Sequence, residues 1–224
     1  MNLTDSLLLR RTLIEEENTA TRELPIKEII ESRKFKTLFV LGVCHLFYSY
    51  FFTNVYKDFG KKYINDDAFL TLVGAIASLS NGFFKLLWAC FLDYYPFRNI
   101  YGGLILLEIS LIVLVNIAVY NRYAFMVVVC LTYMCDGSLS SMFPALTVKQ
   151  FGLVRGPQVY SYMFSVYGVA SVLSIFTVSF VKPQIGYPGM FILSFCFSCV
   201  AAFCTFIFDE KNLYDYVSAY NTYI

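Results

Sequence analysis

Hydrophobic residues fall into six long runs along this chain, separated by short polar segments. The runs cover residues 37–56, 68–92, 100–120, 123–148, 159–181 and 187–208. A helix needs about 20 mostly apolar residues to cross a hydrocarbon layer of ~30 Å, and each run is long enough. The segments between the runs are too short to form a soluble domain. The pattern therefore predicts an all-α membrane protein with six transmembrane helices.

The rest of the chain is polar and divides into a leader, residues 1–36, and a tail, residues 209–224. Of 224 residues, 58% are apolar and 15% charged, whereas about a quarter of a soluble domain is charged. The net charge of +1 offers no field that would attract nucleic acid. The leader lacks the early apolar core of a secretory signal, so we expect the first run to direct insertion. We expect the function to lie within or across the bilayer.

The distribution of basic residues near the runs predicts the orientation. Six crossings place both termini on one side, and cytosolic segments carry an excess of Lys and Arg. The side with the termini holds nine such residues against five on the other: Arg22, Lys27, Arg33, Lys34, Lys36, Arg98, Lys149, Arg155 and Lys211, against Lys57, Lys61, Lys62, Arg122 and Lys182. We therefore expect both termini to be cytosolic, in a membrane that the sequence does not identify.

A charged residue inside an apolar run needs a physical explanation, and Lys85 is the clearest case. A charge at mid-bilayer costs about 2.5–3.5 kcal/mol on insertion scales, so such residues normally face a bundle interior or water. Asn81, Lys85 and Trp88 share one face of their predicted helix, which suggests a lining for an anionic or carboxylate-bearing solute. Two alternatives remain open: Lys85 extends toward the interface, or it pairs with Asp136 on another helix.

Two carboxyl groups also lie inside runs, Glu108 and Asp136. Each is a candidate carrier of a coupling proton or, equally, a structural ion-pair partner. His45 is the only histidine, and we expect it to be a hydrogen-bonded structural residue, because a metal site would need further ligands. The motifs of serine proteases, zinc proteases and phosphate loops do not occur, so we expect neither enzyme activity nor a cofactor.

Small residues recur at helical spacing in the second run, as Gly74, Ser78 and Gly82. Such stripes let helix backbones approach closely in lipid. They support an alternative function, a non-transporting structural subunit whose small-residue faces bind partner helices.

Residues 88–93 followed by Arg98 resemble the short loop signature of the major facilitator superfamily, in which an Asp precedes basic residues. Residues 81–88, 151–152 and 160–171 are similar to the oxalate/formate antiporter-like branch of that family. The resemblance covers residues 34–210 and corresponds to the carboxyl-terminal six-helix half. The leader then resembles the central cytosolic loop that joins the two halves.

This resemblance implies a carrier of small carboxylates that works by alternating access. Lys85 takes the position of the basic residue in the family's eighth helix, and Asp93 and Arg98 those of the gating loop. Ala89 replaces the signature's glycine. Run 159–181 has no positive charge and offers Tyr162, Ser165 and Tyr167 instead, which suits a monoanion such as a monocarboxylate better than oxalate.

The resemblance also implies a partner, because the family holds its solute between two six-helix halves. Three possibilities stay open: the chain is part of a longer carrier, it pairs with another six-span chain, or it no longer transports.

Overall fold

The computed structural model describes residues 24–211, and all regular structure in that part of the chain is helical. Its elements are α2 (Ile26–Glu31), α3 (Arg33–Lys61), α4 (Asp67–Tyr94), α5 (Phe97–Ala118), α6 (Arg122–Phe151), α7 (Arg155–Met163), α8 (Ser165–Phe176), the π-helical turn η1 (Thr177–Val181) and α9 (Lys182–Ile207). The prediction of an all-α membrane protein is confirmed. The division into leader, bundle and tail stays a prediction, since most of the leader and tail lies outside the described residues.

Polar residues just outside the apolar runs fix where several helices begin. Ser32, Asp66 and Asn121 cap α3, α4 and α6 by accepting hydrogen bonds from the first-turn amides. A cap of this kind satisfies an amide that has no partner within the helix. The helices therefore begin before the apolar runs that predict them, and α3 extends from residue 33 although its run starts at residue 37.

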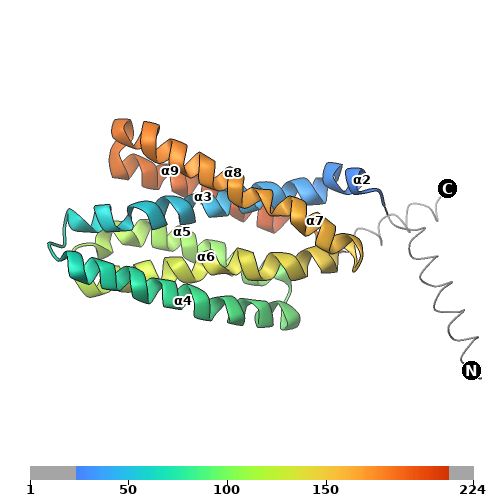
Figure 1. The fold of residues 1–224 in the computed structure, drawn as a ribbon, viewed down its shortest axis with the longest axis horizontal. Coiled ribbons are helices and arrows are strands. Elements are labelled where there is room, and N and C mark those ends of the chain that lie inside the picture. The colour runs from blue at the N-terminus through green and yellow to red at the C-terminus, as the bar shows by residue number, and fades with distance from the viewer. Residues whose placement is uncertain (1–23, 212–224) are drawn as a thin grey trace, which may run out of the picture.

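Five helical stretches are long and apolar enough to cross a membrane, and the last of them spans Arg155–Ile207. Its 53 residues would extend about 80 Å as one straight helix, far more than a bilayer requires. Gly186 interrupts this stretch with φ 67° and ψ −171°, a backbone conformation outside the helical region. The chain reverses there, and α8 and α9 both pack on α3 (Figure 1).

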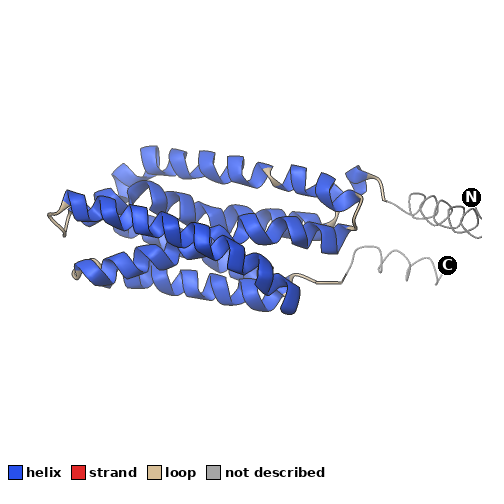
Figure 2. Cartoon of the chain, turned by 60° about the horizontal axis from the view of Figure 1, so that its bottom comes forward, coloured by secondary structure: helices blue, strands red, loops and turns tan. Residues whose placement is uncertain are grey.

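The contacts between helices arrange the rods in two layers. The front layer has the order α4, α6, α3, α8, in which each helix packs on the next. The back layer, α5 and α9, packs behind α6 and α3. The elongated bundle brings the start of α3 and the end of α9 to the same end of the molecule (Figures 1 and 2). We call this the terminal end.

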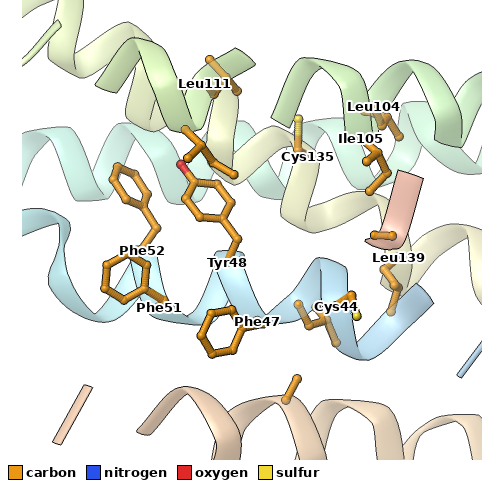
Figure 3. Packing of buried hydrophobic residues seen from close by; sticks show 14 of the residues in the cluster. Cys44, Phe47, Tyr48, Phe51, Phe52, Leu104, Ile105, Leu111, Cys135 and Leu139 are labelled. Carbon is orange, nitrogen blue, oxygen red and sulfur yellow. The ribbon is translucent and has the colours of Figure 1, made fainter. Parts of the chain in front are cut away.

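Aromatic side chains of α3 form the core between the two layers. Phe47, Tyr48, Phe51 and Phe52 are fully buried, and they project from α3 toward the surrounding helices (Figure 3). The ring of Phe47 stacks on Phe197 of α9 at a centroid distance of 4.3 Å. In lipid, packing of this kind replaces the hydrophobic effect as the force between helices, and an aromatic pair contributes about 0.5–1.5 kcal/mol.

The reversal at Gly186 generates a prediction about stability. Its φ/ψ combination is almost exclusive to glycine, so Gly186→Ala should lower the free energy of unfolding by about 1–3 kcal/mol. Thermal unfolding in detergent measures the change. Gly103→Ala is the matched control, because a Cβ there meets nothing within 4 Å. Equal melting temperatures for the two variants would contradict this account of the turn.

Candidate functional site

The seam between α4 and α6 holds the polar residues predicted to line a solute path. Asn81 of α4 donates through its amide to the carbonyl oxygen of Tyr133 at 2.7 Å and to the Asp136 carboxylate at 3.1 Å. Gly137 of α6 makes this approach possible, since a Cβ there would lie 3.1 Å from the Asn81 carbonyl oxygen. Sequence analysis did not identify Gly137, because one glycine in a helix carries no signal without its neighbour.

Lys85 lies on the same seam, one helical turn after Asn81. A Cβ on Gly137 would lie 3.0 Å from Lys85 Cγ, so the lysine stem passes across α6. Lys85 and Asp136 interact electrostatically. In the described part of the chain no carboxylate lies within 4.0 Å of the Lys85 ammonium. Lys85 is also exposed at the surface of this bundle. No tight ion pair with a described residue therefore neutralises its charge.

Asp136 of α6 interacts with side chains from two other helices of the front layer, α4 and α3. Besides Asn81 and Lys85 of α4, its carboxylate interacts with the hydroxyl of Ser49 on α3. Ser49 is buried and Asp136 is half-buried. A carboxylate with an amide, a hydroxyl and a nearby ammonium around it is solvated without direct contact with lipid.

Tyr167 of α8 lies in the same region. It interacts electrostatically with Asp136, Tyr50 and Tyr160. Its hydroxyl is buried and has no hydrogen-bond partner among the described residues. An unpaired buried hydroxyl costs about 1–3 kcal/mol, so this group is available to a ligand. The structure thus brings together Asn81, Lys85, Asp136 and Tyr167 from three helices.

Two other candidates from run 159–181 lie apart from this cluster. Tyr162 is exposed, and the Ser165 hydroxyl donates to the Tyr162 carbonyl oxygen at 2.7 Å.

Trp88 uses its indole N–H in a 3.0 Å hydrogen bond to the carbonyl oxygen of Met134, which ties α4 to α6. The Trp88 ring borders a shallow hollow shared with Ile100 and Gly103 of α5. The position of Trp88 supports a role in holding the seam.

Glu108 lies in the back layer, fully buried. Its carboxylate is 2.6 Å from Nδ1 of His45 and accepts a 2.8 Å hydrogen bond from Ser198 of α9. The geometry agrees with the ion-pair alternative for Glu108 and with a hydrogen-bonded His45. Sequence analysis considered these residues separately, because they are 63 positions apart in the chain.

The predicted gating residues lie at the terminal end, each with another partner. The Asp93 carboxylate is 4.0 Å from the Lys149 ammonium, which also donates to the Leu92 carbonyl oxygen at 2.7 Å. The Arg98 backbone amide donates to Glu210 at 2.6 Å. Within residues 24–211 no ion pair joins Asp93 to Arg98 in this conformation.

A second connection at the terminal end was not predicted. Lys34 of α3 is buried and donates to the side chain of Gln150 on α6 at 2.7 Å and to the backbone carbonyl of Lys211. Gln150 in turn donates to the Glu210 carbonyl oxygen at 2.9 Å. These bonds join three segments distant in sequence, and a hydropathy pattern cannot indicate such a connection.

The close contact at Gly137 yields a second stability prediction. Gly137→Ala would press a methyl group against Asn81 and Lys85 and force α4 away from α6, at a cost of about 1–3 kcal/mol. Gly82→Ala, whose Cβ meets nothing within 4 Å, is the control on the facing helix. Thermal unfolding in detergent should show a loss only for Gly137→Ala; unchanged melting would show that the seam tolerates a wider spacing.

Comparison with known proteins gives one family match. The family model described as Major Facilitator Superfamily matches residues 38–216, which is most of the chain. No curated protein matches.

Proposed function

Because the chain belongs to the major facilitator superfamily, whose members are membrane transporters, we propose that it moves a small organic anion such as a monocarboxylate by alternating access. The single observation that carries the choice of solute is the exposed ammonium of Lys85, which has no carboxylate within 4.0 Å in the described part of the chain. An ammonium attracts a carboxylate, and the Tyr167 hydroxyl adds a hydrogen bond that orients it. A single cation balances one negative charge, which favours a monoanion.

Asp136 connects this site to a proton. With its carboxylate ionised, Asp136 competes with the anion for Lys85. A proton on Asp136 removes this competition and leaves Lys85 free for the solute. Anion and proton would then bind together and cross together. Glu108, the other candidate for coupling, lies behind the site in the back layer.

A second six-helix half is the partner that completes the site. α4 is largely exposed in the structure: only 17% of its apolar membrane-spanning stretch is buried, against 67% for α3. Its exposed surface includes the charge of Lys85, which hydrocarbon cannot solvate cheaply. A second half facing the front layer would enclose these polar groups in an aqueous crevice. It belongs either to a longer form of this protein or to another chain.

Alternating access requires contacts at one end to form and break. With both termini in the cytosol, the terminal end faces the cytosol, and there Asp93 lies in the last turn of α4 and Arg98 in the first turn of α5. In this conformation they bind Lys149 and Glu210. We infer that the two residues exchange these partners as the halves move.

The decisive test is uptake by vesicles from cells that express the full chain. Lys85→Gln removes the charge and keeps the length, and should lower uptake of labelled monocarboxylates at least about tenfold, since a charge-assisted hydrogen bond contributes about 1.5–3 kcal/mol. Lys27→Gln, a lysine of α2 outside the bundle, is the matched control and should transport normally.

Proton coupling is tested by pH. If one proton accompanies each anion, initial uptake should rise by up to about tenfold per unit as the outer pH falls while proton binding limits the rate. Asp136→Asn, a permanently neutral analogue, should lose this dependence. A steep pH dependence that survives in Asp136→Asn would remove Asp136 from the coupling step.

The alternative function, a structural subunit that binds partner helices, is favoured by one observation. A Cβ built on Gly82 of α4 meets nothing within 4 Å in the described part of the chain, so the small-residue stripe is open there, whereas Tyr56 covers it at Gly74. If Lys85→Gln leaves uptake unchanged and instead disrupts assembly, measured as complex mass in detergent, the structural function replaces the carrier.

A further inference from the structure

His45 stands between two carboxyl groups that belong to different layers of the bundle. Its Nδ1 is 2.6 Å from Glu108, in the back layer. On the front side it interacts electrostatically with Asp136. Both His45 and Glu108 are fully buried.

The short distance between His45 and Glu108 requires a proton between them. Two lone pairs repel at 2.6 Å, so either the imidazole N–H donates to a carboxylate, or a carboxylic acid donates to the imidazole nitrogen. Both states keep the bond and differ only in which atom holds the proton. The Ser198 hydroxyl donates to the other oxygen of Glu108 at 2.8 Å and stabilises the ionised form.

The other ring nitrogen of His45 is buried without a partner. Nε2 has no hydrogen bond among the described residues, and neither has the hydroxyl of Tyr101, whose ring centroid lies 5.5 Å from that of His45. Tyr101 also interacts electrostatically with Asp136 and Tyr167. Unsatisfied buried groups are rare in native proteins, and each such group calls for an explanation.

We propose that His45 and Glu108 form a second proton-binding site, which exchanges its proton with Asp136. Asp136 gives up its proton to Nε2, through the Tyr101 hydroxyl or a bridging water, while Nδ1 gives its own proton to Glu108. The products are an ionised Asp136, an imidazole with its proton on Nε2, and a neutral Glu108. Charge and protons balance, because one proton leaves the front carboxyl and one arrives at the rear carboxyl.

This exchange gives the proton a role in solute release. It restores the carboxylate of Asp136, which again competes with the anion for Lys85. The inference rests on the proposed coupling at Asp136 and adds a second proton-binding site outside the proposed solute site. Within the described residues, the titratable groups that interact with His45 are Glu108 of α5 and Asp136 of α6, and its ring lies against that of Tyr101. Tyr48 and Cys135 interact in turn with Glu108, and Tyr167 and Lys85 interact with Asp136.

The single histidine makes the proposal testable by nuclear magnetic resonance. In full chain labelled with ¹⁵N-histidine, both ring-nitrogen signals come from His45. At alkaline pH the proton should be on Nδ1, and Nε2 should take up a proton as the pH falls. In Asp136→Asn this uptake should shift by about one pH unit, since a nearby charge is removed. Asp93→Asn, at the exposed terminal end, is the matched control and should show no shift.

Transport separates the relay from a purely structural role of the pair. Glu108→Gln keeps a hydrogen bond to His45 but cannot accept a proton. It should abolish accumulation driven by a proton gradient and retain exchange of labelled for unlabelled anion, which needs no net proton movement. If the variant does not fold, the spectra of unaltered Glu108 protein still decide the question.

The outcomes distinguish two failures. A His45 titration that is identical in wild type and Asp136→Asn, or a Glu108→Gln variant that accumulates solute normally, would overturn the relay and leave the carrier intact. Loss of the proposed function itself would appear as normal uptake by Lys85→Gln, whatever the histidine spectrum shows.

Discussion

Hydrocarbon solvates neither an ion nor an unpaired hydrogen-bonding group, so every polar atom of this bundle must find its partner in protein or in water. Two answers occur in the same molecule. Between the layers, Glu108 of α5 hydrogen-bonds His45 of α3 and Ser198 of α9, while Nε2 of His45 has no partner among the described residues. In the front layer Asn81, Lys85, Asp136 and Tyr167 lie along a surface that is only partly covered, and the Tyr167 hydroxyl is left without a partner in the described part of the chain. The first group is enclosed by protein, whereas the second needs solvent, solute or another protein surface.

Close packing makes both arrangements possible. Gly137 lets α6 approach α4 until the side chain of Asn81 reaches a main-chain carbonyl of α6. The aromatic residues of α3 fill the space between the layers and set the distance at which His45 meets Glu108. Since lipid gives helices little hydrophobic reason to associate, these contacts of shape and hydrogen bonding hold the bundle together.

The two layers also suggest how a carrier of this kind divides its work. The front layer presents a cation whose strength depends on the state of the neighbouring carboxyl. Glu108 of the back layer and His45 of α3 share one proton, which either residue can hold. At the terminal end, Lys34 and Gln150 join α3 and α6 to the segment after α9, while Lys149 joins α6 to the last turn of α4.

The sequence by itself determined the solvent, the fold class and most of the rods, because an apolar run of sufficient length has only one stable form in a bilayer. It also identified Lys85, Glu108 and Asp136 as residues in need of partners, since a charge in such a run is costly wherever the helix lies. The sequence did not show which side chains contact one another across helices. That His45 meets Glu108, that Lys34 binds Gln150 and that Trp88 faces the carbonyl of Met134 depend on helix rotation and order in the bundle. Hydropathy along one helix does not record which neighbour each of its faces meets, and only the tertiary structure decides that.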